Sequence, residues 1–263
     1  MHKLPDCEFL KLEVVGSRLN LTFNRPDQRN AINSQMGAEF ASVVDWLEKT
    51  LDVRVVVLRG AGGHFCAGGD IKERRDMAED IVTADSDPIM ERNQSAGLAF
   101  LKFENLPQTT IAVVEGSAFG GGMGYACLAD ITIVAAGARM GMPETTLGVA
   151  PAQIAPYVVK RIGLTRARQL ALTAERFDGT KAFEYGIAQY LSADEEIDKT
   201  LEDVVTRVLK CGPMGSLPEE DMIRFSAEKF SELNRGVEGK EGQSAFAEKR
   251  KPDWQVAGDD VKG

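Results

Sequence analysis

Three short runs of β-branched and aliphatic residues, separated by segments with helical spacing, most constrain the fold of this 263-residue chain. The runs lie at Val53–Gly60, Thr110–Glu115 and Ile131–Ala135. Such continuous apolar runs are typical of strands buried on both faces of a parallel sheet. Pro88–Glu104 and Met123–Ala129 lie between them and have the composition of helices. The alternation predicts an α/β fold.

The remaining elements are predicted around this centre. Apolar and polar residues alternate from Leu10 to Phe23 around Gly16-Ser17, which predicts a β-hairpin, and Ala31–Lys49 has helical spacing. We therefore expect an α/β core over residues 1–195 and a helical C-terminal region over residues 196–263. The helices expected from residue 165 onward are Thr165–Thr173, Lys181–Tyr185, Glu195–Lys210, Met222–Leu233 and Glu241–Lys251.

Charge and cysteine content exclude several classes of protein. The net charge of −9 argues against a nucleic-acid partner, because non-specific binding to phosphates needs a basic surface. The four cysteines form no CxxC pair and are expected to be reduced thiols of a cytoplasmic protein. The chain contains no signal-like or membrane-length apolar run, so no membrane partner is expected. The acidic segment Ala78–Pro88 is expected to be a surface loop, and whether it closes over a ligand stays open.

Histidine is scarce, which limits the chemistry that the chain can perform. Only His2 and His64 are present, so a serine–histidine–aspartate triad has few candidates. No two histidines have the helical spacing of a zinc site, and we predict no metal. Acid–base catalysis is therefore expected from carboxylates.

Two Gly-rich loops and one glutamate are the candidates for a site. The loops His64–Asp70 and Phe119–Gly124 each follow a predicted buried strand, and glycine lets backbone N–H groups approach a ligand closely. Either loop alone is better explained as an ordinary tight turn. Glu144 stands among apolar and small residues in Met142–Gly148, where burial would raise the pKa of its carboxyl and suit proton transfer. A surface acid or a helix-start carboxylate is the alternative.

In chain order, FNRP followed by RNA, HFCAGGDIKER, VEGSAFGGGMGYACLADI and GMPETTLGV resemble the enoyl-CoA hydratase/isomerase (crotonase) superfamily. The resemblance implies a crotonase-like α/β superhelix of repeated ββα turns, with a helical C-terminal region that forms trimers, often stacked as hexamers. It also implies an enolate of an acyl-CoA thioester whose oxygen is held by two backbone N–H groups. By position these belong to Gly69 and Gly121. No cofactor is implied, since coenzyme A is part of the substrate.

The resemblance also implies residues that bind coenzyme A. Those expected at the adenine are Ala67, Gly68, Asp70 and Ile71, and those expected at the phosphates are Arg25, Arg29 and Lys72. Lys249, Arg250 and Lys251 are candidates for a neighbouring subunit's coenzyme A. A solvated charged surface is the alternative for each charged residue.

The catalytic residues carry over only in part. Family hydratases often use two glutamates; the second aligns with Glu144, whereas the first falls on Gly124. Two mechanisms remain open: a hydratase in which Glu144 is the sole carboxylate, and a Δ3/Δ2-enoyl-CoA isomerase using the same residue. The amide of Gln153 is a candidate for placing the water. RNA binding, known in one relative, would need a lysine-rich helix, and Ala41–Arg54 is poor in lysine.

Four further segments resemble one branch of the family, the isohexenylglutaconyl-CoA hydratases of acyclic terpene breakdown. They are LPDCE, PAQIAP, GLTRARQLALTAERFDG and EGQSAFAEKRKP. This branch implies a branched substrate with a second carboxylate, for which Arg74 and Arg75 are candidate ligands. The small residues Ala118, Gly124 and Ala150 are compatible with a roomy pocket for the branched chain.

Overall fold

The structure, a computed structural model, describes residues 3–77, 87–211 and 219–253. The chain forms two compact units, residues 1–216 and 217–263. The predicted domain boundary after residue 195 stays a prediction. In the structure, α7 (Ile197–Lys210) belongs to the first unit and packs against its sheet. Most of the predicted acidic loop lies outside the described residues, and only its last two residues, at the start of α3 (Pro88–Glu104), are described.

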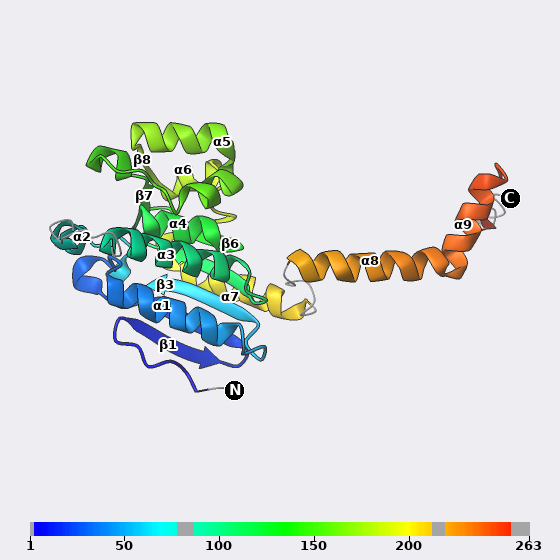
Figure 1. The fold of residues 1–263 in the computed structure, drawn as a ribbon, viewed down its shortest axis with the longest axis horizontal. Helices are drawn as coiled ribbons and strands as arrows, with labels where there is room; N and C mark the ends of the chain where they lie inside the picture. The colour runs from blue at the N-terminus through cyan, green and yellow to red at the C-terminus, as the bar shows by residue number, and fades with distance from the viewer. Residues whose placement is uncertain (1–2, 78–86, 212–218, 254–263) are drawn as a thin grey trace. The chain divides into compact units, whose positions relative to one another are not determined.

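A six-stranded sheet forms the centre of the first unit, in the order β1-β2-β3-β4-β6-β9 (Figure 1). β1 and β2 form the predicted antiparallel hairpin, and every other neighbouring pair in this sheet is parallel. The predicted alternation of buried strands and helices is therefore confirmed. The strands are β1 (Leu10–Val15), β2 (Arg18–Phe23), β3 (Val55–Gly60), β4 (Thr109–Val114), β6 (Ile131–Ala135) and β9 (Tyr190–Ser192).

A second, three-stranded sheet lies beside the carboxyl ends of the main strands. Its strands are β5 (Ser117–Phe119), β7 (Arg139–Gly141) and β8 (Arg176–Asp178). The strands were not expected from the sequence, because three residues are too few to show an alternating pattern. β5 follows β4, and β7 follows β6, so a long strand, a short strand and a helix recur along the chain. This is the predicted ββα repeat.

Helices cover the sheets and form the C-terminal unit. Those of the first unit are α1 (Ser34–Leu47), α2 (Ile71–Met77), α3, α4 (Gly121–Leu128), α5 (Ala155–Thr173), α6 (Gly179–Glu184) and α7. α5 begins ten residues before the predicted helix (165 − 155) and includes a non-helical residue, Gly163, with φ 77° and ψ 159°. The second unit contains α8 (Glu219–Arg235) and α9 (Val237–Ala247). Within the described ranges, every helix is too short or too polar to cross a membrane.

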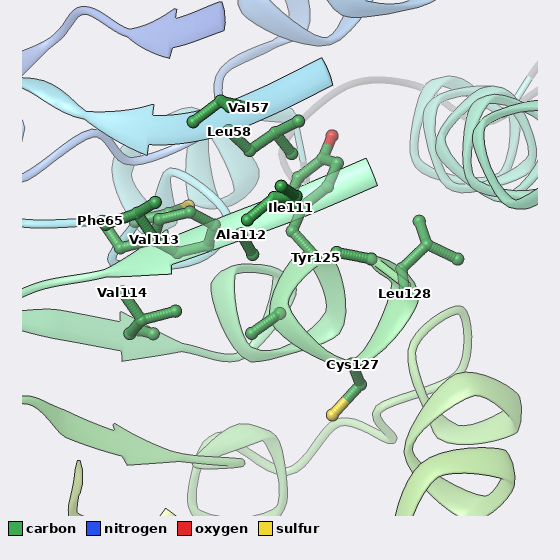
Figure 2. Close-up of a cluster of buried hydrophobic side chains, with 14 of the residues drawn as sticks. Val57, Leu58, Phe65, Ile111, Ala112, Val113, Val114, Tyr125, Cys127 and Leu128 are labelled. Carbon is green, nitrogen blue, oxygen red and sulfur yellow. The ribbon is translucent and has the colours of Figure 1, made fainter. Parts of the chain in front are cut away.

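Helix α4 is enclosed by the hydrophobic core. Every residue after Gly121 in this helix is buried, as expected for a short helix that is apolar on all sides. Figure 2 shows it packed beside β3 and β4, whose Leu58, Ile111 and Ala112 belong to the same cluster. The Tyr125 ring lies 4.8–5.2 Å from the rings of three phenylalanines. This packing holds the first residue of α4 in place at the edge of the core.

Candidate active site

The loop after β3 is held on both sides by backbone hydrogen bonds. On one side the Cys66 N–H donates to the Ser117 carbonyl at 2.9 Å, which ties the loop to β5. On the other side the Ile32 N–H donates to the Gly68 carbonyl at 2.8 Å. Gly68 has φ +93°, and a Cβ there would lie 2.7 Å from the Phe119 carbonyl oxygen, so only glycine fits. The backbone around Gly69 is therefore rigidly placed.

Gly121 is the first residue of α4 and lies close to this loop. Its nitrogen is 3.6 Å from the position of a Cβ on Gly68. At a helix start the N–H has no partner within the helix and carries a favourable partial positive charge. In the described part of the chain, neither the Gly69 N–H nor the Gly121 N–H donates a hydrogen bond to protein. The structure thus brings together the two predicted donors, both available to a ligand.

Both glycines line one cavity of about 520 Å³. Its wall comes from the start of α1, from α2, from one face of α3, from the loop after β3 and from the segment after η3 (Glu144–Leu147). Most of this wall is apolar, which suits an acyl chain. Four charged residues line the cavity: Arg74, Glu91, Arg92 and Glu144.

Glu144 is positioned directly beside the Gly-rich loop of α4. A Cβ on Gly120, which has φ +52°, would lie 2.8 Å from Glu144 Oε1, so the carboxylate rests against a bare backbone. The Gly120 N–H donates to the Gly141 carbonyl at 3.0 Å, which ties this loop to the strand that leads to Glu144. Glu144 Oε2 is buried and has no hydrogen-bond partner among the described residues. An unpartnered buried oxygen is costly unless a ligand or water meets it.

The surroundings of Glu144 favour its protonated form. Burial raises the pKa of its carboxyl, and this effect outweighs a backbone hydrogen bond and the nearby charge of Arg74, which lower it. The direction agrees with the expectation from the sequence. A carboxyl with a raised pKa holds a proton more strongly than an ordinary glutamate, which suits a residue that takes up a proton and returns it.

The position of the missing first glutamate is filled by another side chain. A Cβ on Gly124 would lie 2.4 Å from Ile154 Cγ2, and the Phe100 ring is also close, at 3.7 Å. Ile154 is 4 % exposed and belongs to the core. A larger residue at 124 would therefore require Ile154 to move. The site has been built around glycine here, which leaves Glu144 as the carboxylate beside the two donors.

One face of α3 contributes residues that the sequence reasoning missed. Ile89, Arg92, Asn93, Ala96 and Phe100 all line the cavity. These residues lie on successive turns of the helix, at spacings of three and four residues. Had one of them been known to line the cavity, this spacing would have identified the others. Arg92 is held by Glu73 at 2.9 Å and by the Ile32 carbonyl at 2.8 Å.

Gln153 lines the cavity as expected, but its amide is already engaged. Its Nε2 donates to Asn93 Oδ1 at 2.6 Å, and its side chain packs against Gly97. A role in placing water stays a prediction.

His64 is occupied outside the cavity. Its Nδ1 lies 2.8 Å from the Ser117 hydroxyl, and no carboxylate among the described residues completes a triad with this pair. A histidine-based triad is therefore not formed here, and acid–base catalysis by Glu144 stays a prediction.

Comparison with known proteins identifies the family. The profile described as enoyl-CoA hydratase/isomerase matches residues 16–257. The chain belongs to the enoyl-CoA hydratase/isomerase family. It is an enzyme of that hydratase/isomerase class, with the mixed α/β fold and C-terminal helices of its structural neighbours.

Several members of the family are similar over nearly the whole chain. A probable enoyl-CoA hydratase of Bacillus subtilis is 30 % identical, covering 89 % of this chain and 94 % of that protein. A mevalonyl-coenzyme A hydratase of Beauveria bassiana is 31 % identical over 90 % of this chain and 91 % of that protein. The solved structure of Pseudomonas aeruginosa AtuE is 41 % identical, with a TM-score of 0.78, covering 94 % of this chain and 99 % of that one.

The residues expected at the coenzyme A of this family have different surroundings. Arg25 is not free: it pairs with Asp70 at 3.1 Å, and both side chains are largely buried. Its guanidinium also donates to the Ala31 carbonyl, so it holds the Gly69 loop in place. Arg29, Ile71 and Lys72 are exposed, Ala67 is half-buried and Gly68 is buried. Contact of these residues with coenzyme A stays a prediction.

The basic residues near the end of the chain are partly paired. In the C-terminal unit, Arg250 forms ion pairs with Glu241 and Glu248, both at 2.6 Å. Its hydrogen bond, together with one from the Asp253 N–H, holds the pKa of Glu241 at about 2. Arg250 is thus engaged within its own unit, and the predicted contact of Lys249–Lys251 with a neighbouring coenzyme A is untested.

Proposed function

We propose that the enzyme adds water across the α,β double bond of a 2-enoyl-CoA thioester, with Glu144 as the proton carrier. The observation that carries this proposal is the meeting, at a single cavity, of two N–H groups and one carboxylate oxygen that form no hydrogen bond with any described residue. Donors aimed at a developing oxyanion lower its free energy by roughly 2.7–4 kcal/mol each. The arrangement fits an enolate, whose negative charge develops on the thioester oxygen.

The proposed reaction needs one carboxylate. Glu144 takes a proton from water while the hydroxyl oxygen bonds to Cβ, and the electrons of the double bond move to the thioester oxygen. The N–H groups of Gly69 and Gly121 hold that oxygen. Glu144 then returns the proton to Cα, so the product contains all the atoms of one water. No cofactor is required beyond the coenzyme A that the substrate carries.

We further propose that the acyl group is branched and of the glutaconyl type, as in isohexenylglutaconyl-CoA or 3-methylglutaconyl-CoA. The four sequence segments that resemble the isohexenylglutaconyl-CoA hydratases support this choice, and so does a largely apolar cavity of about 520 Å³. The four free cysteines are compatible with a reducing compartment, so we place the enzyme in the cytoplasm.

Heavy-oxygen water tests the reaction directly. With 3-methylglutaconyl-CoA in H₂¹⁸O, we expect one ¹⁸O atom in a product that is heavier than the substrate by one water. Hydration is expected because Glu144 can both deprotonate water and reprotonate Cα. Product mass is measured by mass spectrometry, with enzyme-free substrate as the control. An unlabelled isomer of unchanged mass, separated from the substrate by chromatography, would instead indicate the Δ3/Δ2 isomerase.

The proposed assembly is a homotrimer or a dimer of trimers. Apolar side chains of the C-terminal unit support it: Phe230, Leu233, Val237 and Phe246 are 68–87 % exposed. Large apolar side chains left exposed in one unit are candidates for an interaction surface. We expect a native mass of three or six times 28.6 kDa by mass photometry. Phe246→Ser should weaken the assembly, whereas Leu51→Ser, at an exposed position of the other unit, should not. A stable monomer would contradict the proposal.

A further inference from the structure

The charged groups at the cavity differ in whether their charge is already paired. Arg92 is neutralised by Glu73 at 2.9 Å. Arg75 lies outside the cavity lining, pairs with Asp76 at 3.2 Å and has a side chain that is 70 % exposed. Of the two arginines considered for a second carboxylate, the structure therefore leaves Arg74.

Arg74 is half-buried, lines the cavity and lies against the Gly69 backbone. A Cβ on residue 69 would be 2.6 Å from its Nη2. No described residue forms a hydrogen bond or an ion pair with its guanidinium. The guanidinium also lies near Glu144, whose carboxyl it influences electrostatically. A charge that has no partner among the described residues, at the wall of a largely apolar cavity, is unfavourable by itself, which points to an anionic ligand group.

The position of Arg74 limits what that anionic group is. The phosphates of coenzyme A are separated from the thioester by the whole pantetheine arm, whereas Arg74 lies beside one of the two donors for the thioester oxygen. A carboxylate four bonds from the thioester carbon reaches about 5 Å along an extended chain. The planar guanidinium offers two parallel donors that match a carboxylate.

We propose that Arg74 binds a second carboxylate on the acyl group, so that the cavity selects dicarboxylic mono-thioesters over neutral enoyl-CoA thioesters of the same branching. This inference rests on the proposed function for its substrate class. The inference attributes selection of the second carboxylate to the Arg74 side chain. That attribution can be wrong even if the enzyme is shown to hydrate enoyl-CoA thioesters.

The test compares two thioesters that differ only in the carboxylate, 3-methylglutaconyl-CoA and 3-methylcrotonyl-CoA. For Arg74→Met, we expect kcat/KM to fall by about 10- to 100-fold more on the glutaconyl thioester than on the crotonyl one. Arg74→Lys should keep part of the discrimination, because it keeps the charge but loses the bidentate geometry. Arg75→Met is the matched control and should leave the ratio of the two substrates unchanged.

Equal losses on both thioesters would overturn the proposal, because Arg74 would then act on the shared thioester rather than on the carboxylate. No loss on either would overturn it as well. Binding of the unreactive 3-methylglutaryl-CoA and isovaleryl-CoA, measured by calorimetry, gives the same comparison without turnover. If wild-type enzyme hydrates neither substrate but Arg74→Met still weakens only 3-methylglutaryl-CoA, the proposed function fails and the carboxylate site stands.

Discussion

Replacing Glu144 with glutamine is expected to lower kcat for hydration by roughly 10²- to 10⁴-fold, the usual contribution of a positioned acid–base group. The amide has nearly the same shape as the carboxyl but can neither take a proton from water nor return one to Cα. Coenzyme A binding should persist, because Glu144 lies at the acyl end of the cavity beside Gly120. Steady-state kinetics with 3-methylglutaconyl-CoA measures the loss, and a fully active variant would refute the assigned role.

Thermal unfolding is the control for Glu144→Gln. The direction of the expected change in melting temperature follows from the raised pKa of Glu144. Between the ordinary carboxyl pKa of 4.5 and the higher folded-state pKa, the folded protein binds more protons at Glu144 than the unfolded chain. The contribution of Glu144 to stability therefore falls as the pH rises through that window. At neutral pH, which lies above the ordinary carboxyl pKa, the raised pKa costs stability, so Glu144→Gln is expected to melt at the same temperature as wild type or higher. A marked destabilisation would mean that lost activity reflects lost structure.

The same pKa sets an expectation for the pH profile. Water is activated by the carboxylate form of Glu144, so kcat/KM should fall as the pH drops through the raised pKa. The acid limb should lie above 4.5, the ordinary value for glutamate. Arg74 lowers the pKa of Glu144, so Arg74→Met should move this limb to higher pH. A shift of the acid limb reports the charge of Arg74, because the pKa of Glu144 responds to that charge.

The sequence predicted those parts of the fold that depend on local patterns. The β1–β2 hairpin, the three buried strands and α3 follow from alternation, apolar runs and helical spacing, and all are confirmed. The strands of the small sheet could not be predicted, because each has three residues and is stabilised by partners far along the chain. The parallel bridge between Cys66 and Ala118 is such a long-range contact, and it places the two Gly-rich loops side by side.

The features of the candidate site also fall into two groups, those that could be predicted from the sequence and those that could not. The Gly69, Gly121 and Glu144 positions could be predicted because the motifs around them, taken together and in chain order, resemble the family. Each position taken alone has an ordinary structural explanation. The packing of Ile154 against Gly124 and the commitment of Arg25 to Asp70 could not, because both depend on segments that meet only in the folded chain. Of the neighbouring Arg74 and Arg75, only the first faces the cavity, and this difference is a property of the α2 helix rather than of the residue type.

Removing the backbone donor of Gly121 is expected to have the second-largest effect. Gly121→Pro deletes the N–H at the first position of α4, where proline is tolerated because the N–H has no partner within the helix. We expect kcat to fall by about 10²- to 10³-fold, as for the loss of one donor to an oxyanion. Kinetics and the temperature of unfolding should be measured together.

Gly121→Ala is the matched control, because it adds a Cβ but keeps the N–H. That Cβ would lie 3.4 Å from Ile32 Cδ1, the flexible end of a side chain that can shift by a few tenths of an ångström. Alanine therefore controls for the Cβ, whereas proline also places its Cδ where the N–H hydrogen was. The proline-to-alanine ratio in kcat measures the replacement of the donor by a methylene group at the thioester oxygen. If both variants lose activity equally, shape at the start of α4 matters and the N–H does not. If proline alone is impaired while both remain folded, the thioester oxygen is held where the Gly121 N–H points.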